Sequence, residues 1–332
     1  MKGKGGATVR ENPKRETILA ALAAGETVSG EEISQALGVT RAAVWKQITS
    51  LRADGYAIPG DPHSGYRLLA DGARAYEVSL LRAFAGAGRR VIFRRETGST
   101  NTDLKALAAA GAPTGTLLVA ETQTDGRGRR GRSFFSPEGG VYFSLLLRPT
   151  LPLVEVSALT GAVAVAVARV LEEQTGIPVG IKWVNDLWLG GKKAVGILCE
   201  AAADLETGTA DYVVVGVGIN LTGTLPSELD GIATTVERAG GRVPDRATLI
   251  AGIVREIEAV APSPLSPGIL SASRRRSVLL GRDVTVLLGG EARSARASAI
   301  NDRGELVVEY PDGKTEALLS GEVSVRLPEG VR

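Results

Sequence analysis

The sequence of 332 residues has little sulfur, little histidine and few aromatics: one cysteine, one histidine, one methionine and 4% aromatic residues. A single cysteine, Cys199, excludes an internal disulfide and is typical of a reducing compartment, so we expect a cytoplasmic protein. One cysteine and one histidine also exclude a zinc site of the usual Cys/His type. His63 is the only histidine and lies in the expected wing, so we expect no Ser/His/Asp triad.

Long hydrophobic runs and net charge are also missing. The most apolar stretch, 156–170, is shorter than the roughly 20 residues that a membrane-spanning helix needs, and the charged N-terminus has no apolar segment typical of a secretory signal. We therefore expect no membrane association. The chain carries 39 Lys+Arg against 37 Asp+Glu, a net charge of +2, so any basic site must be local. Its length predicts two to three domains, at roughly 150 residues each.

After a flexible segment 1–14, residues 15–72 follow the order helix, short helix, glycine turn, helix, hairpin. This order is typical of a winged helix-turn-helix. The last helix has a buried stripe at Val44, Ile48 and Leu51. Off that stripe lie Arg41, Ala42, Trp45, Lys46 and Arg52, which we expect to face DNA. A relic domain or a protein-docking module is the alternative.

The rest of the chain predicts two further domains, after a linker at 70–75. Residues 77–272 mix helices and strands, and several strands follow each other without a helix, which favours an α+β domain on a largely antiparallel sheet. Residues 276–328 contain five short, evenly spaced strands, typical of a small SH3-like β-barrel.

Residues 126–132 place four arginines and three glycines in seven positions, between two predicted strands. Like charges repel, so we expect this loop to close over an anion, where guanidinium groups and backbone N–H groups bind phosphate oxygens. A solvated basic loop and an RNA-binding Arg/Gly segment are the alternatives. The loop lacks the Gly-Lys-Ser/Thr ending of a Walker A loop.

Three more polar motifs follow predicted strands. The Gly-Ser-Thr-Asn motif at 98–101 can cap a helix or present its side chains to a ligand. Lys182 alternates with apolar residues on a strand that ends at Asn185 and Asp186, where a metal–phosphate group could sit. A snorkelling lysine and a turn-forming Asn-Asp pair are the alternatives. The alternating glycines of 216–220 leave room for a ligand or another backbone beside the sheet.

These motifs, with Gly196-Ile197-Leu198, resemble the biotin–protein ligases in order and spacing. The resemblance runs from about residue 15 to the end of the chain. With the winged helix, the chain is similar to the bifunctional bacterial members, which also repress biotin-synthesis genes. One departure is Val184, where the family usually has proline; this should alter the local turn without removing a functional group.

The resemblance implies that biotin and Mg·ATP give biotinyl-5′-AMP and pyrophosphate, and that a lysine of a carrier protein then takes the biotin. It implies that biotin is held by Ser99, Thr100, Asn101, Gln123, Arg127, Gly128, Arg129 and Lys182. It implies catalytic roles for Lys182, Arg127 and Arg129, ATP contacts from Arg129, Arg132, Asn185 and Asn220, and Mg²⁺ at Asn185 and Asp186.

The implied partners are biotin carboxyl carrier protein, operator DNA of biotin genes and a second copy of the chain in a homodimer. Two alternative functions remain at this point. One is a lipoate-type protein ligase, and the other is a ligand-sensing DNA-binding regulator without ligase activity.

Overall fold

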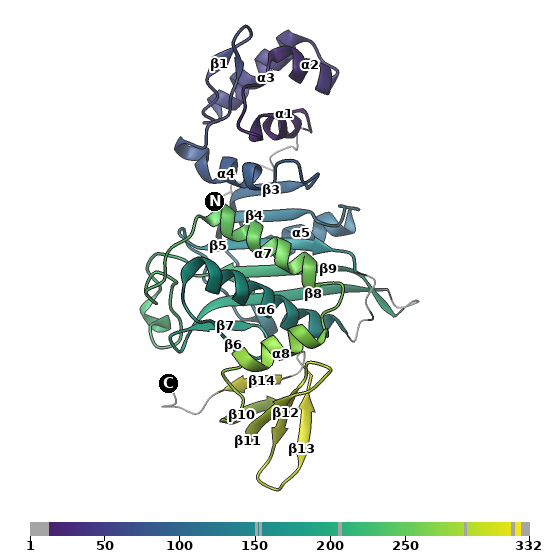
Figure 1. The fold of residues 1–332 in the computed structure, drawn as a ribbon, viewed down its shortest axis with the longest axis vertical. Helices are drawn as coiled ribbons and strands as arrows, with labels where there is room; N and C mark the ends of the chain where they lie inside the picture. Colours follow the sequence, from purple (N-terminus) through teal and green to yellow (C-terminus); the bar gives the residue numbers. More distant parts are fainter. Residues whose placement is uncertain are drawn as a thin grey trace, which may run out of the picture. The chain divides into compact units, whose positions relative to one another are not determined.

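The computed structural model describes residues 13–149, 152, 155–204, 208–288, 291–319 and 323–326. The chain forms two units, one ending at Arg89 and one beginning at Arg90 (Figure 1). Each unit has its own hydrophobic core.

The first unit is a winged helix-turn-helix, as predicted. Its elements are α1 (Pro13–Ala23), α2 (Gly30–Leu37), α3 (Arg41–Ala53), β1 (Gly60–Asp61), β2 (Gly65–Tyr66), the 3₁₀ helix η1 (Gly72–Arg74) and α4 (Ala75–Ala83). Ser29 Oγ accepts from the Glu32 N–H at 3.1 Å, and Glu32 accepts from the Ser29 N–H at 2.8 Å, so a capping box starts α2. At the start of α3, Thr40 Oγ1 accepts from the Ala43 N–H at 3.2 Å and so caps the helix.

The hairpin of this unit is short. Gly60 pairs with Tyr66 and Asp61 with Gly65, and Ala57 and Leu69 form an isolated bridge outside it. Helix α4 was not predicted. It forms because Val78 packs into the core of α1–α3. This contact is long-range, and the Asp-Gly pair before the helix is typical of a turn, so the local sequence does not indicate a helix here.

The second unit contains a seven-stranded sheet in the order β3-β4-β5-β9-β8-β7-β6. The strands are β3 (Val91–Thr97), β4 (Leu117–Gln123), β5 (Val141–Leu147), β6 (Gly180–Lys182), β7 (Asp186–Leu189), β8 (Lys192–Asp204) and β9 (Thr209–Ile219). Only β3 and β4 pair in parallel, which confirms the largely antiparallel sheet.

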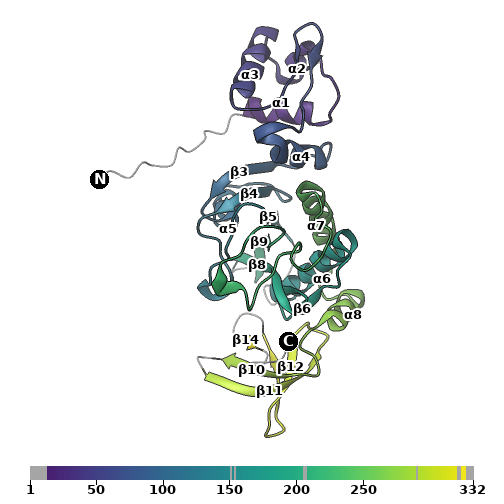
Figure 2. The ribbon, with the colours of Figure 1, turned by 90° about the vertical axis from the view of Figure 1, so that its left-hand side faces the viewer.

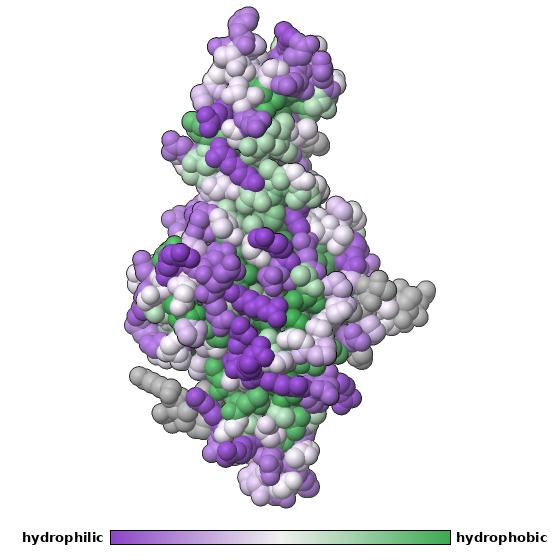
Figure 3. Space-filling model, in the orientation of Figure 1, coloured by the Kyte–Doolittle hydropathy of each residue, from purple (hydrophilic) through white to green (hydrophobic). Residues whose placement is uncertain are grey.

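Helices cover both faces of this sheet. Figure 2 shows α6 (Val156–Thr175) and α7 (Arg246–Val260) on one side and α5 (Thr100–Ala109) on the other. The apolar stretch of the sequence is buried in α6. On the face of the molecule that Figure 3 shows, hydrophilic side chains gather over α7 and over the later helix α8 (Pro267–Arg276). Within the described residues, no helix is long and apolar enough to cross a membrane.

The end of the unit is a five-stranded antiparallel sheet, here called the C-terminal sheet, which confirms the small β domain. Its strands are β10 (Asp283–Leu288), β11 (Glu291–Ile300), β12 (Leu306–Glu309), β13 (Thr315–Leu318) and β14 (Val323–Arg326), in the order β13-β12-β11-β10-β14. Helix α8 (Pro267–Arg276), which precedes it, was not predicted, because three arginines and few apolar residues obscure its buried face.

Candidate functional site

Three glycines form a floor on the α5 side of the sheet. A Cβ at Gly216 would lie 2.1 Å from Asn101 Oδ1, and Cβ atoms at Gly218 and Gly196 would lie 2.6 and 2.9 Å from the Phe134 ring. The glycines therefore do make room beside the sheet. The side chains of Asn101 and Phe134 lie against these glycines.

The Gly-Ser-Thr-Asn motif lies at the start of α5, next to this floor. Ser99, Thr100 and Asn101 are all buried. Ser99 is the N-cap residue but makes no capping hydrogen bond, so capping does not explain the motif. The Thr100 N–H donates to Gln123 Oε1 at 2.9 Å, which joins α5 to β4.

Asn101 is held inside the wall of the site. Its Nδ2 donates to the Leu198 carbonyl at 3.2 Å and to Glu200 Oε2 at 2.8 Å. Ser144 Oγ lies 2.6 Å from Asn101 Oδ1 and 2.8 Å from Thr100 Oγ1. Ser144 and Glu200 were missed by the sequence analysis, because only strand pairing brings them to this wall.

These residues surround a cavity of about 30 Å³, here called the glycine-floored cavity. It is lined by Ser99, Thr100, Asn101, Gln123, Arg127, Phe134, Gly196, Leu198, Gly216, Val217 and Gly218. A space of this size holds about two waters. The Phe134 ring fills the rest and lies edge-on to Tyr142, with centroids 6.4 Å apart. Phe134 was also missed, although two adjacent aromatics after an arginine loop are a signal in a chain with so few.

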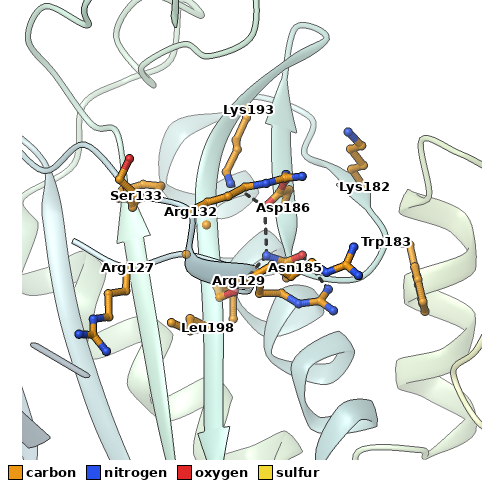
Figure 4. A pocket seen from close by; sticks show the side chains of 15 residues that line it. Arg127, Arg129, Arg132, Ser133, Lys182, Trp183, Asn185, Asp186, Lys193 and Leu198 are labelled. Atoms are coloured by element: carbon orange, nitrogen blue, oxygen red, sulfur yellow. Dashed lines mark hydrogen bonds and ion pairs between the residues drawn. The ribbon is translucent and has the colours of Figure 1, made fainter. Parts of the chain in front are cut away.

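A second cavity of about 120 Å³, here called the arginine-lined cavity, adjoins the first and shares Arg127, Phe134, Gly196 and Leu198 with it. Its charged lining residues are Arg127, Arg129, Arg130, Arg132, Lys182 and Lys193, with Asp186 as the one carboxylate among them (Figure 4). Cations gathered in a recess create a local positive potential. The cavity is therefore suited to an anion with several charges.

The Arg/Gly loop makes its own backbone hydrogen bonds. The Gly128 N–H donates to the Arg132 carbonyl at 2.7 Å, and the Phe134 N–H donates to the Gly126 carbonyl at 2.8 Å. Arg129 reaches Asn185 Oδ1 at 3.3 Å. Burial lowers the pKa of Arg129. The nearby charges of Arg130 and Arg132 lower this pKa as well, whereas the charge of Asp186 raises it. A bound anion would stabilise the charged guanidinium of Arg129.

Two lysines line the arginine-lined cavity in different ways. Lys193 Nζ lies 2.7 Å from Asp186 Oδ1 and 5.7 Å from the centroid of Phe134, so it stands between the two cavities. Lys182 is half-buried, as expected, and its ammonium lies 5.1 Å from the centroid of Trp188. Figure 4 shows Lys193 extending to Asp186. Lys193 was missed because the pairing of β7 with β8, not the sequence, brings it to Asp186.

Asn185 and Asp186 follow β6, after a cis peptide bond between Trp183 and Val184. Asn185 Nδ2 donates to Asp186 Oδ1 and to the Ile197 carbonyl, each at 3.2 Å. No group of three or more His, Cys, Asp or Glu that could hold a metal occurs in the part of the chain that the structure describes. One carboxylate beside one amide fits Mg²⁺ when ligand phosphates complete the set, because Mg²⁺ is usually bound that way.

Asn220 lies away from the lining described for these two cavities. It is buried, and its Nδ2 donates to the Thr234 carbonyl at 3.3 Å. Its backbone carbonyl accepts from the Val236 N–H at 2.9 Å. In this structure Asn220 therefore anchors the segment that follows β9.

In the first unit, the outer side of α3 presents Arg41, Ala42, Trp45 and Lys46 to solvent, and Trp45 is 51% exposed. Arg41 pairs with Glu31 of α2. Arg52 departs from the expectation that it faces DNA. It donates to the Ile58 carbonyl at 2.7 Å and to the Gly60 carbonyl at 2.6 Å, and so braces the wing.

Comparison with known proteins places these features in a class. Residues 93–220 match the Biotin/lipoate A/B protein ligase family, residues 14–67 match an HTH domain, and residues 279–326 match the Biotin protein ligase C terminal domain. The fold is thus that of the biotin and lipoate protein ligases.

Individual relatives narrow the class. The chain is 37% identical over 320 residues to Bifunctional ligase/repressor BirA of Bacillus subtilis, covering 92% of this chain and 96% of the relative. It is 30% identical to Bifunctional ligase/repressor BirA of Escherichia coli, covering 97% and 100%. A biotin protein ligase from Aquifex aeolicus, solved in complex with biotin and ATP, matches 72% of this chain and 99% of its own with a TM-score of 0.61 and 30% identity. The chain belongs to the biotin protein ligase family, in the group of bifunctional ligase/repressors.

Proposed function

We propose that this protein is an enzyme that joins biotin to ATP as biotinyl-5′-AMP and transfers the biotin to a lysine of biotin carboxyl carrier protein. The observation that carries the proposal is the pair of adjoining cavities, one floored by glycines and one lined by cations. The Aquifex aeolicus relative, crystallised with biotin and ATP, supports the same pairing of ligands.

In the first step a biotin carboxylate oxygen attacks the α-phosphorus of ATP, and the bond to the bridging oxygen of pyrophosphate breaks. Both reactants are anions, so the site must offset their repulsion before they meet. Lys193, which stands between the two cavities, would supply positive charge together with Arg129 and Arg132 of the arginine-lined cavity. A preorganised charge in a water-poor site stabilises such a transition state strongly. The step needs no protein nucleophile.

The glycine-floored cavity would take the biotin ring system. Ser99 would bond to the ring, and Thr100 and Gln123, which already bond to each other at 2.9 Å, would present the other polar groups. Asn101 would form part of the cavity wall, and its hydrogen bonds to Leu198 and Glu200 hold the start of α5 against the glycines of the sheet. Phe134 must move from the floor to admit the ring, and it then covers the ring's apolar side.

The arginine-lined cavity would take the phosphates. Arg127 lines both cavities with its side chain 48% exposed, so with Gly128 it would close over the acyl-phosphate. Lys182, Arg132 and Asn185 line this cavity and would contact the phosphates. Asn220, which bonds to Thr234, would stabilise the segment after β9 without contacting the phosphates itself. Mg²⁺ held by Asn185 and Asp186 would neutralise charge on the pyrophosphate.

In the second step the carrier lysine attacks the carbonyl of the mixed anhydride, and AMP leaves. Closure of the arginine loop keeps water from this anhydride. We also propose that the first unit binds operator DNA as part of a homodimer, because one winged helix offers few phosphate contacts. A cytoplasmic location agrees with this role.

The test is transfer of radiolabelled biotin to a carrier domain, with lipoate offered in a parallel reaction. Label on the carrier lysine that depends on ATP and biotin supports the proposal. Transfer of lipoate alone would assign the protein to the lipoate branch. Operator binding without any transfer would reduce it to a DNA-binding regulator.

A further inference from the structure

One side chain of the Lys182–Asp186 segment borders the arginine-lined cavity and is also buried in the core of the C-terminal sheet. Trp183 is only 8% exposed, and it packs in the core of the C-terminal sheet together with residues of β10–β12. Its Nε1–H donates to the Gly304 carbonyl at 3.1 Å. In Figure 4 its ring stands apart from the polar group around Asp186. A residue between two site residues in sequence is therefore anchored in a different sheet.

The turn that receives Trp183 is braced from within. Asn301 Oδ1 accepts from the N–H groups of Arg303 and Glu305, each at 3.0 Å, and the Gly304 N–H donates to the Asn301 carbonyl at 3.0 Å. Gly304 has φ +75°, in the left-handed region that favours glycine. The Gly304 carbonyl is thus held in a fixed direction.

This turn is also fastened to the helical layer. Arg274 of α8 donates to the Ile300 carbonyl and to Asp302 Oδ1, each at 2.7 Å. The Val278 N–H, between α8 and β10, donates to the Ile181 carbonyl of β6 at 3.0 Å. The strand that leads into the site is therefore attached to the segment before the C-terminal sheet through its backbone, and to the turn of that sheet through the Trp183 indole.

We propose that Trp183 is a positioning residue, whose anchoring in the C-terminal sheet fixes Asn185 and Asp186 in the arginine-lined cavity. Asn185 meets Arg129 at 3.3 Å and Asp186 meets Lys193 at 2.7 Å. Loss of the anchor lets the segment shift and disturbs both contacts. The glycine-floored cavity keeps its walls, because Ser99–Asn101, Gln123 and β9 belong to other elements. The inference rests on the proposed function, since it concerns the nucleotide side of that reaction.

The test uses the full chain and biotin-dependent exchange of pyrophosphate into ATP, with ATP and biotin varied separately. Trp183→Phe keeps an aromatic ring in the core and removes the N–H donor. We expect kcat/KM for ATP to fall about fivefold, the equivalent of one neutral hydrogen bond, while KM for biotin stays within about twofold. Arg274→Gln, which loosens the turn without touching Trp183, should give the same one-sided change.

Tyr310→Phe is the matched control. It removes a 2.7 Å hydrogen bond to Glu316 from a residue packed on the same core, without touching Trp183 or Gly304. A melting curve for each variant measures the loss of stability. Wild-type ATP kinetics in folded Trp183→Phe, or equal changes in the ATP and biotin parameters, would overturn the inference. Absence of exchange in the wild-type protein would instead overturn the proposed function.

Discussion

Replacing Lys193 with methionine removes a cation from the junction of the two cavities and keeps the length of the side chain. Its ammonium lies 2.7 Å from Asp186, and the two side chains are 33% and 23% exposed. One preorganised charge at a transition state contributes ~3–4 kcal/mol, and partial exposure reduces that value. We expect adenylation to slow by about 100-fold, the equivalent of ~2.7 kcal/mol.

The assay is pyrophosphate release at saturating biotin and ATP, with Lys182→Met as the matched comparison. Lys182 lines the same cavity, with its ammonium 5.1 Å from the centroid of Trp188, and the resemblance implies a catalytic role for it, so its loss should slow adenylation by a comparable factor. The melting temperature of Lys193→Met should change little, because a partly exposed ion pair contributes less than about 1 kcal/mol. A folded Lys193→Met variant with a near-normal rate would refute the reasoning.

Gly216→Ala, whose Cβ would lie 2.1 Å from Asn101, should raise KM for biotin at least about tenfold, whereas Gly231→Ala, with open space around it, should leave KM unchanged. Trypsin cleavage in 126–132 should be slowed by biotin plus ATP, because an anion relieves repulsion among the arginines; equal cleavage rates would count against closure. Cys199 is partly buried, and desolvation raises its pKa to about 11, from 9.0, so alkylation at pH 8 should be about 100-fold slower than for an exposed thiol, and rapid labelling of folded protein would contradict the raised pKa. Trp45→Ala should weaken operator binding without lowering the melting temperature, and unchanged affinity would remove the outer side of α3 from the DNA interface.

Much of the fold follows from local patterns in the sequence. The run 141–147 is apolar except for Ser144 and begins with three residues that favour strands, Val141, Tyr142 and Phe143, and β5 has those bounds. The capping box at Ser29 marks the start of α2. Helices α4 and α8 lack such signals, because their apolar faces become evident only against the cores they cover.

The site divides in the same way. Motif residues such as Ser99 and Asn185 were singled out because polar groups at the ends of elements stand out in a sequence, whereas Gln123 followed only from the family resemblance. Lys193, Phe134 and Glu200 were missed because strand register and the path of the arginine loop bring them to the cavities. Their neighbours in space are distant in sequence: Glu200 bonds to Asn101 across 99 positions.

The most direct test of the central claim is formation of biotinyl-5′-AMP by the purified chain, given biotin, ATP and Mg²⁺ without any carrier protein. The adjoining cavities predict an adenylate that forms in stoichiometric amount, releases equal pyrophosphate and stays bound to the protein. A folded protein that binds biotin but yields neither adenylate nor pyrophosphate would contradict the assignment of the arginine-lined cavity to ATP.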